Sequence, residues 1–408
     1  MRLAGDAGQV HLTYCLNIHA GETWAEHRES IRTSACRVRD LVAWPGDFGL
    51  GLRLGARAAA ELDEAGRLRE VAQWLAAQRL YAFTINGFPY GTFHGTRVKE
   101  QVYAPDWTQA ARVEYTLRLG RILAALLPEG VPGSISTVPG TYRAWAGPGV
   151  RARILANLVT VVAALSRLEA ETGRMVCLAL EPEPDCLWDQ VEQVMEWFHH
   201  DLLTHGVTLL AAQVGSSRET AAQALRRHLG VCLDTCHQSV LYDDPGLALT
   251  RLLESGVAVP KIQISAAPVF ETTAAGLDRA RGFIDPCYLH QSCLSTRTGL
   301  RQRYADLPEA IAAAGGMPEA SELRTHFHIP LVLDAGAGFR STRAELSRPF
   351  WRLAGSGRVP HLEVETYSFG VLPPELRQVS VEASLAGELA WVQRALAEAR
   401  APGAGAVL

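Results

Sequence analysis

The sequence predicts a parallel (β/α)8 barrel of the TIM type. Eight short segments rich in β-forming residues recur along the 408 residues, separated by longer stretches whose apolar residues have helical spacing. Strand, helix and strand repeated eight times is typical of this barrel, because hairpin-linked antiparallel strands need connections of only a few residues. The expected strands are 11–19, 48–54, 81–86, 133–138, 176–181, 229–234, 261–266 and 361–366.

Each expected strand has one apolar face and one face of small or polar residues. In 176–181, for example, a valine and two leucines alternate with Cys177, Ala179 and Glu181. Helices cover the outside of a parallel barrel, so the apolar face must point outward and the polar face into the lumen. Gly49 and Gly51 lie on this inward face, where we expect them to keep the interior open rather than to form a nucleotide loop.

The intervening segments complete the expected architecture. We expect helices in the stretches 56–79, 116–128 and 152–173. A ninth strand-like run, "HFHIPLVLD", falls in the connection between the last two barrel strands. The predicted organisation is one barrel domain over 1–400, with an insertion or long loop at 267–325, a glycine-rich and aromatic-rich loop at 86–107, and a disordered tail at 401–408.

The amino-acid composition indicates which kinds of molecule the protein binds. Hydrophobic residues make up 48%, charged residues 20%, and the formal net charge is −4, so no general attraction to nucleic acid is indicated. The N-terminus lacks a signal-peptide pattern and no run is apolar enough to span a membrane, which makes the cytoplasm the expected location. The eight cysteines lack the paired spacing of a structural zinc site, so we expect them to be reduced packing residues.

Carboxylates end three of the expected strands. In these barrels the active site lies at the C-terminal ends of the strands, where Glu181, Asp234 and Glu365 would converge. Like charges packed closely do not all stay ionised unless something positive sits among them. A divalent metal ion is therefore expected at this rim.

Further ligands would come from side chains near the same rim. His237, Gln263 or a histidine of the "HFH" run, His326 or His328, could complete the site. Oxygen ligands favour Mn²⁺, Mg²⁺ or Co²⁺, whereas a larger share of histidine favours Zn²⁺. Residues that end strands or lie in rim loops are expected to contact substrate: Asn17, His19, Arg53, Asn86, His94, Arg97, Lys99, Glu183, His290 and His326.

These motifs resemble the xylose isomerase-like TIM barrels. The shared features are a strand ending in Glu-Pro ("LALEPEP"), a strand ending in aspartate with histidine three residues on ("CLDTCH"), and a last strand ending in glutamate ("LEVET"). More narrowly, "TYCLNIHAGETW", "FTINGFPYGTFHGTRVKEQVYAPDW", "DPCYLHQ" and "HLEVETYSFGVLPPELR" resemble the EboE family of metabolite traffic proteins. That resemblance implies partner proteins from one gene cluster, linked to export of a small metabolite.

The resemblance assigns roles residue by residue. It implies that Glu181, Asp234 and Glu365 are metal ligands and that His237 matches the histidine after the aspartate. Gln263 stands where these barrels usually carry a metal-binding histidine. Glu183 stands where xylose isomerase carries a lysine, which argues against the same hydride-shift chemistry.

The function expected from the sequence is a metal-dependent isomerase or epimerase of a small polyhydroxylated metabolite, a sugar, sugar phosphate or cyclitol. Glu181 and Glu365 would exchange a proton with carbon, while Arg53 and Lys99 would hold a phosphate or hydroxyls. Two alternatives remain open: metal-assisted phosphoester hydrolysis as in endonuclease IV, and a binder that hands a metabolite to other proteins without changing it.

Overall fold

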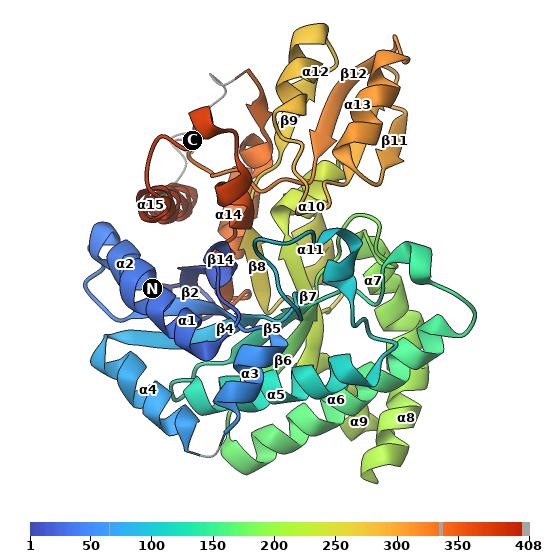
Figure 1. Cartoon of the computed structure of the whole chain (residues 1–408). Helices are drawn as coiled ribbons and strands as arrows, with labels where there is room; N and C mark the ends of the chain where they lie inside the picture. Colours follow the sequence, from blue (N-terminus) through green and yellow to red (C-terminus); the bar gives the residue numbers. More distant parts are fainter. Residues whose placement is uncertain (65, 334–337, 402–408) are drawn as a thin grey trace, which may run out of the picture.

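A computed structural model describes residues 1–64, 66–333 and 338–401 and confirms the predicted barrel (Figure 1). Eight strands pair in parallel in the order β2-β14-β8-β7-β6-β5-β4-β3, and a short β1 adds to β2 in antiparallel fashion. The strands are β1 (Arg2–Ala4), β2 (Gln9–Tyr14), β3 (Phe48–Arg53), β4 (Leu80–Asn86), β5 (Gly133–Thr137), β6 (Val176–Leu180), β7 (Leu229–Asp234), β8 (Lys261–Ile264) and β14 (His361–Val364).

The barrel closes at Cys15, which follows β2 and forms a parallel bridge with Gly51 of β3. The first strand is shorter than predicted, because the chain turns into a 3-10 helix at Leu16–Ile18. A Cβ atom on Gly51 would lie 1.8 Å from Glu363 Oε1, so only glycine leaves room for that inward-pointing carboxylate. This confirms that the glycines of β3 keep the lumen open.

Residues of the polar strand faces meet inside the lumen, as predicted. Thr84 Oγ1 and Ser134 Oγ lie 2.8 Å apart across β4 and β5. Lys261 Nζ lies 2.5 Å from Glu363 Oε2 and donates to Ser136 Oγ at 3.3 Å. The alternation of side chains along each strand therefore sets which residues face the site.

Helices surround the barrel (Figure 1). The predicted stretch 56–79 divides into two helices, whereas 116–128 and 152–173 fall almost wholly within one long helix each. The helices outside the second sheet are α1 (Trp24–Ser30), α2 (Cys36–Val42), α3 (Ala56–Leu62), α4 (Arg67–Ala77), α5 (Ala110–Leu126), α6 (Val150–Thr172), α7 (Val191–Trp197), α8 (Val207–Val214), α9 (Arg218–His228), α10 (Thr235–Val240), α11 (Pro245–Glu254), α14 (Arg348–Ala354) and α15 (Val381–Arg400).

A second, antiparallel sheet lies between β8 and β14 in the sequence and above the barrel in Figure 1. Its strand order is β11-β10-β12-β9-β13, and α12 and α13 accompany it. The predicted insertion or long loop is thus a folded sheet-and-helix unit that extends beyond residue 325. Its elements are β9 (Pro268–Glu271), α12 (Ala274–Arg281), β10 (Ser292–Thr296), β11 (Arg301–Tyr304), α13 (Leu307–Gly315), β12 (Ala320–Thr325) and β13 (Arg340–Ser341).

The prediction of a strand at "HFHIPLVLD" is wrong. The strand precedes this run: β12 ends at Thr325, and residues 326–330 have no regular structure. The His326 N–H still donates to the carbonyl of Gln291, after which the chain leaves the second sheet for the barrel mouth. Asp334 at the end of the run, and residues 402–408 of the predicted tail, lie outside the described residues.

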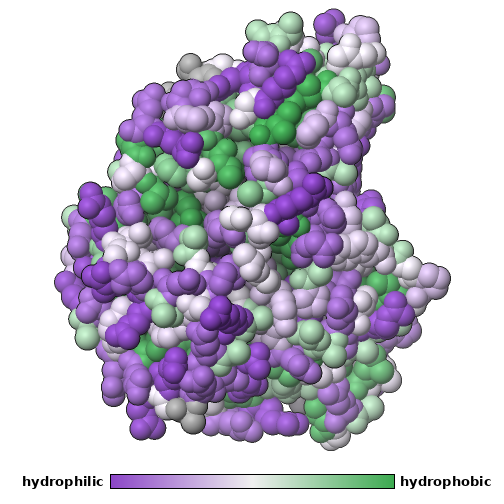
Figure 2. All heavy atoms as spheres, viewed as in Figure 1, coloured by the Kyte–Doolittle hydropathy of each residue, from purple (hydrophilic) through white to green (hydrophobic). Residues whose placement is uncertain are grey.

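One hydrophobic cluster spans the barrel, its helices and the second sheet. The viewed face is mainly hydrophilic, with larger hydrophobic patches in its upper half (Figure 2). All eight cysteines are free, and six of them are buried, as expected for packing residues. No helix in the described residues is long and apolar enough to cross a membrane.

Candidate metal centre and cavity

Strand β6 ends at Leu180, and Glu181 is the first residue after it. The Glu181 N–H makes a last bond to the Thr137 carbonyl at 3.0 Å, and Pro182 and Pro184 then supply no N–H groups for further pairing. The chain continues without pairing as a strand and carries two buried carboxylates, Glu181 and Glu183, at the barrel mouth.

Asp234 has two structural tasks at the end of β7. It caps α10, with its Oδ1 accepting the His237 N–H at 3.0 Å and the Ser265 hydroxyl at 2.8 Å. A capping side chain bonds the N–H two or three residues ahead, which here is the N–H of His237. This holds His237, the third residue after Asp234, at the barrel mouth. Asp234 Oδ2 is buried without a protein hydrogen bond.

Glu365 follows β14 and is oriented by two amides. Asn17 Nδ2 and Asn86 Nδ2 donate to its Oε1 at 2.7 and 2.9 Å. Asn86 ends β4 and Glu365 follows β14, as predicted, whereas Asn17 lies in the 3-10 helix after β2 and not in the strand. Glu365 is therefore fixed at the mouth before any ligand binds.

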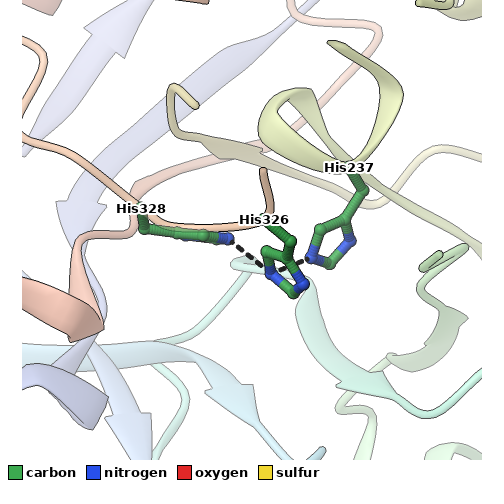
Figure 3. A group of neighbouring side chains, drawn as sticks. All are labelled: His237, His326 and His328. Atoms are coloured by element: carbon green, nitrogen blue, oxygen red, sulfur yellow. Dashed lines mark hydrogen bonds between the residues drawn. The ribbon is translucent and has the colours of Figure 1, made fainter. Parts of the chain in front are cut away.

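Three buried histidines meet over this mouth (Figure 3). His237 comes from α10, and His326 and His328 come from the segment that leaves β12. His326 Nε2 lies 3.1 Å from His237 Nε2 and 3.1 Å from His328 Nε2. The three rings point toward one another, with His326 in the middle (Figure 3).

Hydrogen bonds fix which nitrogen of His237 and His328 carries the proton. His237 Nδ1 lies 3.0 Å from the carbonyl of Pro182, and His328 Nδ1 lies 3.0 Å from the carbonyl of Glu365. A carbonyl oxygen only accepts, so both Nδ1 atoms must donate. The Nε2 atom of each neutral ring is then a bare lone pair.

His326 has the same tautomer for a similar reason. Its Nδ1 lies 2.8 Å from Gln291 Oε1. The amide of Gln291 is oriented by its Nε2, which donates to the Pro184 carbonyl at 3.0 Å and to Tyr103 Oη at 2.6 Å. His326 Nδ1 therefore donates, and its Nε2 is also a lone pair.

Three Nε2 atoms thus face one another at close range, and their Nδ1 hydrogen bonds leave each Nε2 available as a metal ligand. Burial is the main factor that lowers the pKa of His328 to about 4 and the pKa of His326 well below its usual value, which keeps these two rings neutral near pH 7. Lone pairs at 3.1 Å repel unless a cation lies between them. Nitrogen ligands at about 2.0 to 2.1 Å in a tetrahedral zinc site are about 3.3 Å apart, close to the observed spacing. The residues present fit a divalent metal ion.

Acidic side chains surround the histidine cluster. Glu181 and Asp234 form a further group in which ligand atoms, with one ring nitrogen of His237, lie within 4.8 Å of one another. Glu181 Oε2 is buried without a protein hydrogen bond. Each histidine also has a carboxylate oxygen near its Nδ1: Glu181 at 4.0 Å from His237, Glu183 at 3.6 Å from His326 and Glu365 at 3.8 Å from His328.

These carboxylates strongly affect one another. Burial, followed by Asp234, raises the pKa of Glu181 well above its usual value. Burial, followed by Glu181 and Asp234, does the same to the pKa of Glu365. Among the described residues, the one lysine inside the lumen is Lys261, which is paired with Glu363. Excess negative charge at the mouth again favours a bound cation.

A cavity of about 60 Å³ opens beside the histidines. The predicted site residues that line it come from the end of β4, from the segments that follow β2, β6, β7 and β14, from the loop 86–107 and from the segment after β12. They are Asn17, Asn86, Lys99, Glu181, Glu183, His237, His326, His328 and Glu365. Asp234 does not line the cavity. Its carboxylate nevertheless lies within 4.8 Å of ligand atoms of Glu181, His237 and His328, which do.

Arg53 does not line the cavity, contrary to the prediction that it holds substrate. Its guanidinium donates to the carbonyls of Gly21 and Gly91 at 2.8 and 2.6 Å and pairs with Glu22 at 3.2 Å. Arg53 therefore braces two loops of the rim. Lys99 does line the cavity, but its Nζ is bound to Asp306 Oδ2 at 2.7 Å.

Other predicted residues also lie outside the lining. Gln263 Oε1 accepts a hydrogen bond from Cys232 Sγ at 3.0 Å, deep in the lumen. His19 and His94 have neighbouring partners: Tyr14 Oη lies 3.0 Å from His19 Nε2, and Tyr288 donates to His94 Nδ1. Two more residues stand apart: His290, which is buried between Asp285 and the His326 carbonyl, and Arg97, which is exposed.

Several residues of the site were not predicted. Alternation with Gln263 along β8 could have identified Lys261 as an inward residue. Gln291 lies in the "DPCYLHQ" motif, yet no local pattern indicates that it orients His326. Tyr103 and Tyr367, which line the cavity, likewise carry no sequence signal that separates them from core aromatics.

Comparison with solved structures finds distant similarity to xylose isomerase-like proteins. A probable 3-DHS dehydratase, AsbF, from Bacillus anthracis is 11% identical, with 94% of this chain and 98% of that chain covered and a TM-score of 0.42. The IolI protein with a bound zinc atom is 12% identical, with 96% and 100% covered and a TM-score of 0.45. A xylose isomerase domain protein from Alicyclobacillus acidocaldarius gives the same identity, coverage and score.

No protein-family model matches the chain, and comparison with curated proteins gives no match. Membership of the EboE family therefore stays a prediction. At these TM-scores the fold assignment depends on the strand order of the barrel itself.

Proposed function

We propose that this chain is a metal-dependent isomerase or epimerase of a small, oxygen-rich metabolite. The observation that carries the proposal is the convergence of three buried Nε2 atoms, from His237, His326 and His328, beside a cavity. A bound divalent ion would polarise substrate oxygens and acidify the adjacent C–H bond. Nitrogen donors favour zinc or a similar borderline ion over magnesium, which differs from the expectation for an oxygen-rich site.

The chain's own residues supply a carboxylate suited to proton exchange. Glu365 lines the cavity, and Asn17 and Asn86 hold its Oε1, which leaves Oε2 toward His328. Burial raises its pKa, which brings the carboxylate closer to the range useful for removing and returning a proton at carbon. Glu181 faces the same cavity and would act as the second carboxylate.

Metal content tests the first part of the proposal. Protein purified without chelator is expected to contain metal by elemental analysis, and the His326→Ala, His328→Ala double variant is expected to contain little. His199→Ala, at an exposed position outside the site, serves as the matched control and should keep its metal. Equal metal content in the double variant and the control would contradict a histidine-held ion.

Deuterium exchange tests the second part, because it detects proton removal at carbon whatever product is formed. The metal-loaded protein is incubated with candidate sugars and cyclitols in D2O, and NMR detects deuterium that enters at carbon. Glu365→Gln should abolish this incorporation while circular dichroism shows an unchanged fold. Full incorporation by Glu365→Gln would exclude the proposed role of this carboxylate.

The predicted place in a metabolite export pathway, with partner proteins from one gene cluster, belongs to this proposal as well. Its support is the sequence resemblance to the EboE family alone. A small metabolite as substrate is supported by the polar and aromatic residues that line the cavity beside the histidines.

A further inference from the structure

Two chemically unlike sets of residues line the cavity. The histidines and carboxylates form one. The other is built from hydrocarbon and aromatic groups contributed by three separate segments: the loop 86–107, the stretch 285–291 before β10, and the 3-10 helix that follows β14. We refer to this second side as the apolar wall, which consists of Phe88, Pro89, Phe93, Val98, Val102, Tyr103, Tyr288, Leu289 and Tyr367.

Aromatic rings from the three segments contact one another in this wall. The ring centroids of Phe93, Tyr288 and Tyr367 are 5.2 to 5.4 Å apart in each pair. The Tyr367 ring also lies 4.8 Å from the ring of His328. The wall is therefore continuous with the histidine cluster, and a ligand that reaches the histidines also meets the rings.

Most polar atoms of the apolar wall are already engaged. Tyr288 Oη donates to His94 Nδ1 at 2.9 Å, because His94 Nε2 itself donates to the Asn17 carbonyl at 2.6 Å. Tyr103 Oη donates to Glu183 Oε1 at 2.8 Å. A ligand at this wall thus meets carbon surfaces, with few groups that can replace the hydrogen bonds of lost water.

The wall also lacks a cation for an anionic ligand. Among the described residues that line the cavity, Lys99 carries the one permanent positive charge, and Asp306 neutralises it at 2.7 Å. The carboxyl groups of Glu181, Glu183 and Glu365 also line the cavity, and in their ionised form they would repel an anion. A phosphate placed here would be buried without a partner, which is costly.

We propose that the ligand is an uncharged, amphipathic small molecule. Its oxygen-bearing end would face the three histidines, and an apolar ring would lie against Phe93, Tyr288 and Tyr367. A sugar or cyclitol would have to turn its C–H groups toward the apolar wall, because hydroxyls placed there would lose hydrogen bonds. A sugar phosphate or nucleic acid fits worse, because the wall offers no free cation. From the proposed function, this inference takes only the bound metal ion.

A matched pair of chelators tests the apolar wall. Acetohydroxamate and benzohydroxamate share one metal-binding head, and only the second carries a ring. In the metal-loaded full chain, calorimetry should give at least about tenfold tighter binding for benzohydroxamate, in line with burial of a ring. A third probe, 4-carboxybenzohydroxamate, adds a negative charge at the far end of the ring and should bind at least about tenfold more weakly than benzohydroxamate, because a buried unpaired charge is costly.

Two variants locate the effect in the wall. Phe93→Ala removes one ring, and Val102→Thr keeps the side-chain shape but adds a hydroxyl; both should reduce the advantage of benzohydroxamate while acetohydroxamate binds as before. Val379→Thr is the matched control at an exposed position and should change neither affinity.

The outcomes separate the two proposals. Bound metal with equal affinity for the two hydroxamates, or tighter binding of the carboxylated probe, would overturn this inference and leave the proposed metal site intact. A protein that takes up no metal and binds neither hydroxamate would refute the proposed function, and this inference with it.

Discussion

At the scale of single residues, the orientation of side-chain protons decides what the site can bind. Gln291 contributes no ligand atom to the histidine cluster, yet its Oε1 requires His326 to carry a proton on Nδ1. Without that acceptor, the proton could move to Nε2, where it would compete with a metal ion. Groups that orient a metal-binding histidine in this way typically contribute ten- to a hundredfold to metal affinity.

Gln291→Ala is therefore expected to weaken metal binding by about 10- to 100-fold. Competition with a fluorescent zinc chelator measures the affinity. Gln213→Ala, an exposed glutamine on α8, is the control and should bind metal like the unmodified chain. If Gln291→Ala kept full affinity, the tautomer of His326 would not depend on this amide.

Gly51 is a second residue whose role is set by a single contact. Gly51→Ala would place a methyl group 1.8 Å from Glu363 Oε1, and Lys261 holds the other oxygen of this carboxylate, Oε2, in the closed lumen. Overpacking of this kind costs about 1 to 3 kcal/mol of unfolding free energy. Urea unfolding measures the loss, and Gly147→Ala, where a Cβ meets no atom within 4 Å, should be nearly neutral. Equal stability of the two variants would show that the lumen can adapt.

At the scale of elements, α15 is attached to the barrel mouth by a buried acid. Glu388 Oε2 accepts the Leu331 N–H and the Thr366 hydroxyl, both at 2.9 Å. Burial is the main cause that raises the pKa of Glu388 from 4.5 to about 7. Between these two pH values the unfolded chain loses the proton while the folded chain keeps it, so stability falls as pH rises through this window.

Glu388→Gln should remove that pH dependence. From pH 4.5 to 8, the unmodified chain is expected to lose up to about 3 kcal/mol more unfolding free energy than the variant, an order-of-magnitude value from the pKa shift. Urea unfolding at several pH values measures the difference between the two proteins. Glu398→Gln, an exposed glutamate on the same helix, is the control. Parallel pH profiles for Glu388→Gln and the unmodified chain would contradict an elevated pKa.

The eight barrel strands were predictable because their signal is local. Alternation with a period of two separates Glu181, Asp234 and Glu365 from the outward leucines and valines, and proline after Glu181 ends the strand at the rim. The antiparallel sheet over 268–341 was not predictable from the same pattern. Its order depends on pairings such as β12 with β9, which a single sequence does not specify.

The histidine cluster marks the same limit within the site. The strand ends identified Glu181 and Asp234, but His237 and His326 are 89 residues apart, and they meet only because the second sheet delivers the chain to the barrel mouth. Arg53 shows the converse: its position at a strand end suggested substrate binding, whereas it does not line the cavity and its Nη1 and Nη2 donate to backbone carbonyls of two loops.

At the scale of the whole molecule, the proposed metal ion would join the two sheets. His237 belongs to the barrel, through α10, while His326 and His328 lie on the segment that leaves β12 of the second sheet. A ligand that binds only the folded state adds RT ln(1 + [L]/Kd) to stability, about 2.7 kcal/mol at a free concentration 100 times Kd. Part of this added stability should strengthen the contact between the second sheet and the barrel, because the ligands of the ion come from both.

Metal removal should therefore act locally as well as globally. Treatment with EDTA is expected to lower Tm and to speed amide hydrogen exchange most in residues 320–330 and in α10, since these segments carry the histidines. Strands β4 and β5, on another part of the barrel, provide the internal reference and should change little. In the His326→Ala, His328→Ala variant, EDTA should have almost no effect on either measure. A uniform rise in exchange over the whole chain would indicate that metal stabilises the fold without joining its two sheets, and an EDTA effect that persists in the variant would place the ion elsewhere.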